Sequence, residues 1–193
     1  MKLFPPFRLI LQGPVLAGKR IILRPPVMED FQAWVELREE SRDFLEPWEP
    51  EWNDGEFSRH NFRLRLKAYR DWAQADHALS LFVFSSTSPK LLGGITLGNI
   101  RRGVQQSGTL GYWIGARHAR QGYMSEAVHL LVSYGFAEFR LHRIEAACLP
   151  RNIASRALLH SCGFAEEGLA RSYIKIAGKW EDHVLYAKVN SGT

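Results

Sequence analysis

The chain has 193 residues and a mass of 22.1 kDa, with 46% hydrophobic and 23% charged residues. This size fits one globular domain, and an aromatic content of 12% excludes a disordered chain. The net charge of +5 and the pI of 9.4 are compatible with anionic ligands or nucleic acid, but they are modest for a dedicated DNA-binding protein.

The elements in chain order begin with an N-terminal segment, residues 1–18, that is expected to be irregular because it contains Pro5, Pro6 and Pro14. Residues 19–189 are expected to form a single α+β domain. The apolar spacing predicts seven strands, three of which form an antiparallel meander, and four helices. The strands are predicted at 20–24, 79–85, 91–100, 109–115, 143–149, 169–176 and 183–189, and the helices at 28–41, 58–75, 123–139 and 152–161.

An aromatic segment with two prolines, 44–50, separates the first two helices. The prolines restrict its backbone, and its Phe44 and Trp48 have no partner at helical or strand spacing. Two interpretations stay open: a hydrophobic plug over the core, or one wall of a substrate cleft.

A strand, a basic loop and a helix start follow one another at 114–127. The start of a helix exposes unpaired N–H groups and the positive end of its dipole, which together favour a phosphate group. Gly122 permits close approach of the backbone, and Arg120 adds a cation. Further arginines crowd this part of the chain, at 101, 102, 117, 140, 143, 151 and 156, so an anion site is expected here.

Several segments together resemble the GNAT superfamily of acetyl-CoA-dependent N-acetyltransferases. They read GYMSEAV at 122–128, HRIEA at 142–146, N-x-x-S at 152–155 followed by GF at 163–164, FLEPWEP at 44–50, and GKWEDHVLYA at 178–187. The resemblance spans about residues 19–189 and is strongest to the branch of ribosomal-protein alanine N-terminal acetyltransferases. It implies a mixed seven-stranded sheet that is splayed between its fourth and fifth strands, with acetyl-CoA bound in the opening.

The resemblance also implies which residues bind acetyl-CoA. The family's diphosphate loop, Q/R-x-x-G-x-G/A, falls on 119–124, where Gly122 matches and Ala119 and Met124 depart from the pattern. Backbone N–H groups need no particular side chain, and Arg117 or Arg120 is expected to replace the lost polar side chain. The implied contacts are Trp113, Ile114, Gly115, Arg117, Arg120, Gln121, Gly122, Tyr123, Met124 and Asn152. For Asn152, a helix cap without cofactor contact is the alternative.

Two residues are candidates for the chemistry. The tyrosine that many family members carry four residues before the GF pair is replaced by Leu159. The resemblance therefore favours Ser155 as the group that stabilises the leaving thiolate, against a plain structural role near the helix start. Glu145 is the best carboxylate for a base acting through water, and an ion pair with a nearby arginine is its alternative.

The expected reaction is direct transfer of acetyl to an amine, since Cys148 and Cys162 lack a paired base and are expected to be buried free thiols. The preferred acceptor is the N-terminal α-amine of a ribosomal or other protein. One alternative is a small amine such as an antibiotic or polyamine. The acidic residues at 46, 49, 51, 54 and 56 would suit a polyamine and a basic peptide equally well. The other alternative is a ribosome- or nucleic-acid-binding module with a GNAT fold.

No metal site is expected, because no histidine stands at metal-ligand spacing from a cysteine. No apolar run approaches the roughly 20 residues that span a bilayer. Pro5 and Pro6 also interrupt any signal-peptide core. We therefore expect a cytoplasmic protein without membrane contact, either a monomer or a homodimer.

Overall fold

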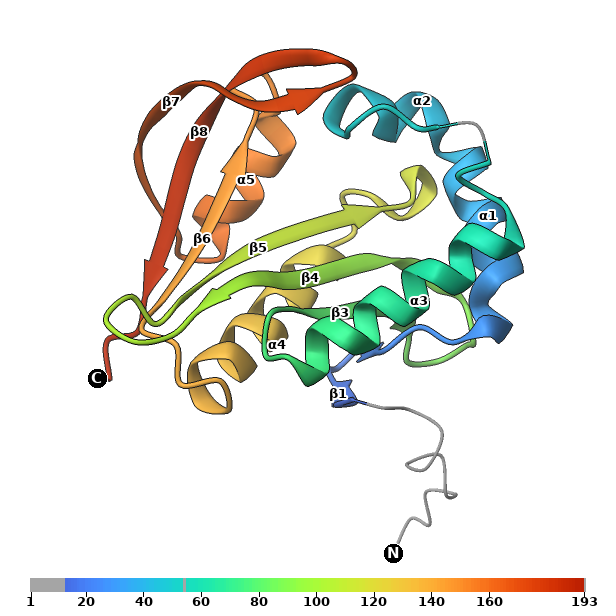
Figure 1. The fold of residues 1–193 in the computed structure, drawn as a ribbon, viewed down its shortest axis with the longest axis horizontal. Coiled ribbons are helices and arrows are strands. Elements are labelled where there is room, and N and C mark those ends of the chain that lie inside the picture. The colour runs from blue at the N-terminus through green and yellow to red at the C-terminus, as the bar shows by residue number, and fades with distance from the viewer. Residues whose placement is uncertain (1–12, 54, 193) are drawn as a thin grey trace, which may run out of the picture.

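In the computed structural model, which describes residues 13–53 and 55–192, a mixed eight-stranded sheet lies between two layers of helices (Figure 1). The strand order is β1-β2-β3-β4-β5-β6-β8-β7, and β5 and β6 are parallel while the other neighbours are antiparallel. The strands are β1 Leu16–Ala17, β2 Ile21–Arg24, β3 Leu79–Ser85, β4 Leu91–Arg101, β5 Ser107–Ile114, β6 Arg143–Cys148, β7 Ala165–Ile176 and β8 Lys179–Val189.

The α-helices are α1 Phe31–Glu40, α2 Arg42–Leu45, α3 Arg59–Gln74, α4 Tyr123–Ala137 and α5 Ile153–Ser161. Short 3₁₀ turns occur at Met28–Asp30, Glu46–Trp48 and Ala116–His118. The predicted helix caps are confirmed: the Ser58 side chain accepts a hydrogen bond from the Asn61 N–H, and the Asn152 side chain accepts one from the Ser155 N–H.

The seven predicted strands and four predicted helices are all present, and the structure adds strand β1, helix α2 and short 3₁₀ turns. Strand β1 lies inside the segment that was expected to be irregular, where Leu16 pairs with β2 and packs on the core. A two-residue strand has no periodicity of its own, so the sequence pattern misses it. Residues 1–12 of that segment lie outside the described residues. Helix α2 and the following 3₁₀ turn occupy most of the predicted aromatic loop.

Other differences concern where elements begin. The first helix starts at Phe31 instead of residue 28, because the Asp30 carboxylate accepts a hydrogen bond from the Val27 N–H and holds a 3₁₀ turn. Both β7 and β8 start four residues before their predicted positions. Most side chains of β7 are exposed, so these extensions have no buried apolar face that the sequence pattern could reveal. They are strands because their backbones are hydrogen-bonded to each other.

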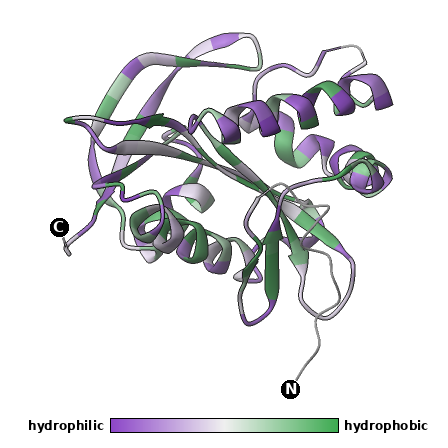
Figure 2. Ribbon diagram, turned by 60° about the horizontal axis from the view of Figure 1, so that its bottom comes forward, coloured by the Kyte–Doolittle hydropathy of each residue, from purple (hydrophilic) through white to green (hydrophobic). Residues whose placement is uncertain are grey.

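The sheet separates two hydrophobic cores (Figure 2). On one face, α4 and α5 pack on the sheet through fully buried side chains such as Leu97, Leu131 and Ile144. On the other face, α1 and α3 contribute an aromatic cluster in which the Trp34 and Phe62 rings lie 5.0 Å apart. These two cores hold the central strands in place and leave their ends available for a site.

The sheet is splayed between β5 and β6, the fourth and fifth of the predicted strands, as the resemblance implies. These strands pair at only three positions, Ser107↔Arg143, Gly108↔Ile144 and Thr109↔Glu145. Beyond them, β5 stays paired with β4 as far as Ile114, and β6 stays paired with β8 as far as Cys148. The two strands therefore diverge from a common base.

The far end of this opening is bounded by the hairpin between β7 and β8, whose tip lies beside α2 (Figure 1). There the Ala177 N–H donates a hydrogen bond of 3.0 Å to the Glu49 carbonyl oxygen. The opening is thus framed by strand pairing at one end and by this backbone contact at the other.

Among the described residues, no helix has both the length and the apolar character needed to cross a membrane.

The packing of α3 yields a direct test of the second core. Leu66 is 9% exposed and Leu64 is 52% exposed on the same helix. Replacing Leu66 with alanine leaves a cavity, so we expect Leu66→Ala to lower the free energy of unfolding by about 2–5 kcal/mol. Leu64→Ala, the matched control, should change it by less than about 0.5 kcal/mol. Urea denaturation measures both, and equal losses would contradict the described packing.

Candidate active site

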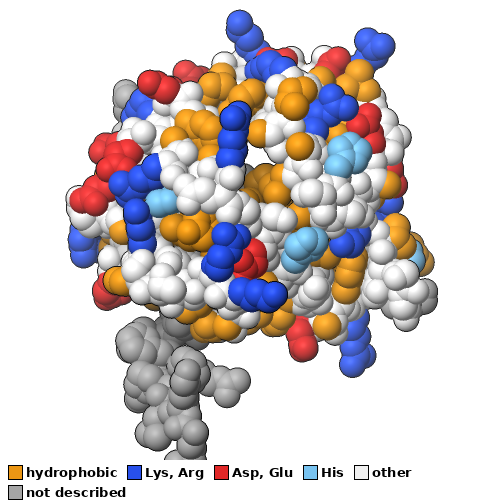
Figure 3. Space-filling model, turned by 180° about the vertical axis from the view of Figure 1, so that it is seen from behind, with side chains coloured by type: hydrophobic (Ala, Val, Ile, Leu, Met, Phe, Trp, Pro, Cys, Tyr) orange, Lys and Arg blue, Asp and Glu red, His pale blue; other side chains and the backbone are white. Residues whose placement is uncertain are grey.

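A cavity of about 1070 Å³ lies in the opening between β5 and β6 and extends to the face that carries α4 and α5. That face is hollowed near its centre, with hydrophobic side chains inside the hollow and lysine and arginine side chains around it (Figure 3). The cavity is lined by the C-terminal parts of both strands, the first turns of α4 and α5, and residues of the aromatic segment that include Phe44, Leu45 and Trp48. The aromatic segment therefore forms a cleft wall, the second of its two interpretations.

Two strand edges face each other across this cavity. Residues Leu110–Ile114 are paired with β4 on one side only, and Ala146–Cys148 are paired with β8 on one side only. Their other edges carry backbone N–H and C=O groups that no strand covers. An extended ligand with alternating amide donors and acceptors is suited to such an edge.

The loop before α4 presents further backbone donors to the cavity. Gly122 has φ +80° and Arg120 has φ +59°, so the chain turns through two left-handed residues before the helix begins. The Glu126 N–H donates to the Gly122 carbonyl oxygen as the first bond of the helix. The N–H groups of residues 123–125 thus have no acceptor within the helix, and these residues line the cavity. This geometry favours an anion.

Arg20, the residue before β2, supports this loop and is not among the site residues predicted from the sequence. Its Nη1 donates to the Gln121 carbonyl oxygen at 3.0 Å, and its guanidinium lies 4.8 Å from the Tyr123 ring centroid. The Glu126 carboxylate accepts from both the backbone N–H and Nε of Arg20. Since Arg20 and Gln121 are 101 positions apart, no local pattern could reveal this contact.

A hydroxyl pair spans the opening. The Tyr112 Oη on β5 lies 2.7 Å from the Ser155 Oγ on α5, and the Ser155 N–H is held by Asn152 Oδ1 at 3.0 Å. Burial raises the pKa of the Tyr112 phenol and also that of the neighbouring Cys148 thiol. Both groups are therefore protonated at neutral pH, and Cys148 is a poor nucleophile because its thiolate is disfavoured. Cys148 and Cys162 are free buried cysteines, as the sequence predicts.

The structure brings most predicted site residues to one cavity. Those that line it are Trp113, Ile114, Arg120, Gly122, Tyr123, Met124, Asn152 and Ser155. Four others lie outside its lining. The Gly115 N–H donates to the Leu92 carbonyl oxygen, Arg117 forms an ion pair with Glu40, and Gln121 donates to the Arg117 carbonyl oxygen. The fourth, Glu145, accepts a hydrogen bond of 2.8 Å from Arg143 Nε.

The Glu145 contact is the ion pair that the sequence left as its alternative role. Arg143 also pairs with Glu167, so the strand surface around Glu145 is a network of charges. Its action as a base through water stays a prediction.

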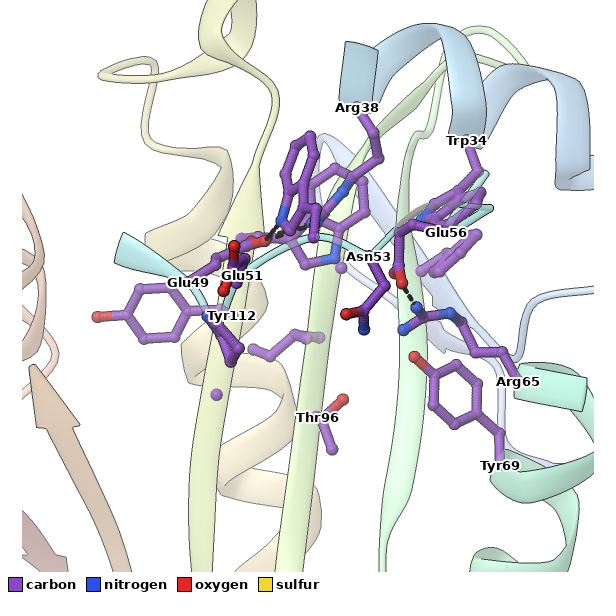
Figure 4. Close-up of a pocket in the computed structure, with 17 residues that line it drawn as sticks. Trp34, Arg38, Glu49, Glu51, Asn53, Glu56, Arg65, Tyr69, Thr96 and Tyr112 are labelled. Atoms are coloured by element: carbon purple, nitrogen blue, oxygen red, sulfur yellow. Dashed lines mark hydrogen bonds and ion pairs between the residues drawn. The ribbon is translucent and has the colours of Figure 1, made fainter. Parts of the chain in front are cut away.

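A second, smaller cavity of about 440 Å³ lies on the face that carries α1 and α3 (Figure 4). Arg38, which is buried between the rings of Trp52 and Trp113, donates from Nη1 and Nη2 to the two carboxylate oxygens of Glu49. The Trp52 indole N–H donates to the same carboxylate at 2.8 Å. Both cavities are lined by Glu49, Gly111, Tyr112 and Trp113, so they meet at β5.

The acidic residues near this second cavity are mostly neutralised. Glu46 pairs with Arg42, Glu49 with Arg38, and Glu56 with Arg65. Asp54 lies outside the described residues. Within the described part of the chain, no group of three or more His, Cys, Asp or Glu side chains is placed to hold a metal ion.

The comparisons with known proteins all point to the same family. The model of the acetyltransferase (GNAT) domain matches residues 20–165. The chain is 37% identical to the probable N-acetyltransferase YjcK of Bacillus subtilis, covering 91% of this chain and 97% of that protein. It is 32% identical to the [ribosomal protein uS5]-alanine N-acetyltransferase of Escherichia coli, with 89% of each chain covered. The solved structure of Mycobacterium smegmatis RimJ, in complex with CoA-disulfide, superimposes with a TM-score of 0.83 at 31% identity, covering 92% of this chain and 86% of that one.

His118, which lines the larger cavity, gives a test of the site's electrostatics. It is buried, and its Nε2 accepts a hydrogen bond from Arg117 Nε. Burial lowers the pKa of His118, the nearby charges of Lys90 and Arg117 lower it further, and Glu40 acts in the opposite direction. Below a pH of about 6.5 the unfolded chain therefore binds a proton here more readily than the folded chain does.

The folded state should lose stability as the pH falls through that range, and the loss should level off below the folded pKa of His118. We expect His118→Gln, which keeps a hydrogen-bond acceptor and does not titrate, to lose less stability than the wild type between about pH 7.5 and about pH 5.5. Thermal denaturation at a series of pH values measures this, and identical slopes for the two proteins would contradict the assignment.

Proposed function

Since the chain belongs to the GNAT family and is an N-acetyltransferase, we propose that it transfers the acetyl group of acetyl-CoA to the N-terminal α-amine of a protein, with a ribosomal protein as the first candidate. The observation that carries this proposal is the meeting of two cavities at β5, one on each face of the sheet. Two substrates approaching from opposite faces would come together beside Tyr112 and Trp113.

The larger cavity fits acetyl-CoA by its donor set. The free N–H groups of residues 123–125 suit a diphosphate, and each hydrogen bond to a charged group contributes about 1.5–3 kcal/mol. The uncovered edge of β5 suits the amides of the pantetheine arm. The predicted cofactor contacts of Trp113, Ile114, Arg120, Gly122, Tyr123, Met124 and Asn152 all belong to this cavity. Acetyl-CoA supplies an activated acyl group when it is bound there.

The chain's own residues would then position the reactants and stabilise charge. Backbone N–H groups of β5 are available to the carbonyl oxygen as negative charge develops on it. Ser155 lines the cavity beside Tyr112, and its hydroxyl would stabilise the departing thiolate. Acetyl passes directly to the amine, because the raised pKa of Cys148 argues against a thioester on the enzyme.

The weak set of bases supports an α-amine acceptor. A protein N-terminus has a pKa of about 7.7–8.0, so on the order of a tenth of it is already nucleophilic at neutral pH. For lysine, with a pKa of about 10.4, the fraction is below about a thousandth. A site that mainly orients its substrates and excludes water therefore suffices for an N-terminus.

The smaller cavity supports a peptide acceptor more than a polyamine. Polyamines carry several positive charges and need several unpaired carboxylates, whereas Glu49 and Glu56 are already bound to arginines. Glu51 lines the cavity and forms no ion pair with another described residue, so one carboxylate is left for a single ammonium group. The E. coli relative's name specifies a ribosomal alanine terminus, which makes an N-terminal alanine the first acceptor to test.

The acceptor is tested with matched peptides and mass spectrometry. One peptide begins with a free alanine and contains no lysine; the second has the same sequence with a blocked N-terminus and one internal lysine. We expect acetyl-CoA-dependent labelling of the first peptide, at a rate at least about tenfold above that of the second, because about a tenth of an N-terminal amine is deprotonated at neutral pH and less than about a thousandth of a lysine amine is. Faster labelling of the blocked peptide, or of spermidine, would overturn the α-amine proposal.

The diphosphate site is tested at Gly122. Gly122→Glu places a carboxylate beside the helix N-terminus, so we expect the affinity for coenzyme A to fall by about 100-fold or more, as measured by calorimetry. Gly103→Glu is the control, because Gly103 also has positive φ (+66°) but lies in the β4–β5 turn with no atom near its Cβ position. Unchanged affinity in Gly122→Glu would move the diphosphate site elsewhere.

A further inference from the structure

The Tyr112 hydroxyl on β5 reaches across the opening to Ser155 on α5, the residue that is proposed to stabilise the thiolate. We propose that Tyr112 is a positioning residue: it donates its hydroxyl proton to Ser155 and thereby directs the serine's own O–H toward the leaving sulfur. This inference rests on the proposed role of Ser155.

Strand alternation determines where Tyr112 points. Leu110, Tyr112 and Ile114 contact the core on the α4 side of the sheet, whereas Trp113 packs against Phe82 on the opposite side. Tyr112 lies three positions beyond Thr109, the last residue of β5 that pairs with β6. Its side chain therefore crosses the opening instead of meeting a neighbouring strand, and it reaches α5.

The serine is held so that its hydroxyl faces this phenol. Ser155 lies in the first turn of α5, and its N–H is bound by the Asn152 cap. Its Oγ is 2.7 Å from Tyr112 Oη, and its other polar neighbour is the sulfur of Cys148. Sulfur is a weak donor and acceptor, so Tyr112 is the strong partner of this hydroxyl.

The direction of the hydrogen bond decides whether Ser155 can act. A serine hydroxyl has one proton and two lone pairs. If it donated that proton to Tyr112, none would remain for the thiolate. A phenol is more acidic than an aliphatic hydroxyl and is the better donor, and burial raises the pKa of Tyr112 so that its proton is retained. Tyr112 therefore donates, and Ser155 keeps a proton to offer.

The reaction step balances with this arrangement. The lone pair of the neutral amine forms the new C–N bond, and the C–S bond breaks with its electron pair passing to sulfur. The thiolate accepts a hydrogen bond from Ser155, whose oxygen accepts one from Tyr112, and the excess proton on nitrogen is released to water. Tyr112 itself neither gains nor loses a proton.

The test is a double-mutant cycle of Tyr112→Phe and Ser155→Ala, with acetyl transfer to the free-alanine peptide as the assay. We expect Tyr112→Phe to lower kcat about tenfold and to leave the KM for acetyl-CoA within about twofold, because the ring and the cavity shape are kept. Because Tyr112 acts through Ser155, the double variant should be no slower than Ser155→Ala by more than about twofold. Tyr134→Phe, on α4 outside both cavities, is the control for loss of a tyrosine hydroxyl.

The pH profile separates positioning from acid catalysis. A positioning residue does not ionise during the reaction, so Tyr112→Phe should keep the shape of the wild-type profile of kcat. Loss of the alkaline limb in Tyr112→Phe would instead identify it as a proton donor and overturn the inference. Wild-type kcat in Tyr112→Phe, or losses that simply multiply in the double variant, would also overturn it.

Failure of the proposed function is distinguishable from these outcomes. If the wild type acetylates only a small amine, the acceptor assignment is wrong, and the same cycle is run with that amine. If Ser155→Ala alone retains full kcat, the role of Ser155 is wrong, and the inference about Tyr112 is overturned with it.

Discussion

The short pairing between β5 and β6 is the constraint on which the site depends. Three register positions hold the two strands together, and beyond them each is held by a different neighbour, β4 or β8. A buried strand edge without partners costs free energy, because each of its unpaired backbone groups loses the hydrogen bond that water gives it in the unfolded chain. A sheet divided in this way is stable only where a ligand or solvent completes the edges. The opening thus leaves backbone groups of both strands available to a ligand or to solvent.

Charge in the site is arranged by pairing. Arg20 is bound to Glu126 beneath the loop that precedes α4, and Arg38 is bound to Glu49 between two tryptophan rings. These ion pairs orient the side chains that line the two cavities, and because each pair is neutral, it adds little net charge to the cavities. Attraction for an anion then comes from the helix start, whose donors are fixed by the backbone, together with Arg120, which lines the larger cavity. A fixed dipole of this kind does not reorganise when the ligand binds.

Much of this fold follows from the periodicity of the sequence. The parts that do not follow from it have one physical cause in common. The apolar spacing of α3 and α4, the Asn152 cap and the glycine before α4 are local signals, and the structure confirms the elements that they predict. Contacts between distant segments leave no such signal. Arg20 reaches the loop before α4 from the turn between β1 and β2, and Tyr112 meets α5 only because the sheet opens beneath it. Similarly, the outer parts of β7 and β8 exist through hydrogen bonding to each other, with polar side chains that resemble a loop.

The backbone contact between Ala177 and Glu49 turns the opening into a closed frame that passes through the sheet. Each face of the molecule then has its own entrance, one beside α5 and the other beside α3. Under the proposed function, a modified peptide would withdraw by the way it came while the nucleotide end of the spent carrier is still held on the opposite side. Which product departs first is accordingly a matter of relative affinity, and neither has to wait for the other to clear its path.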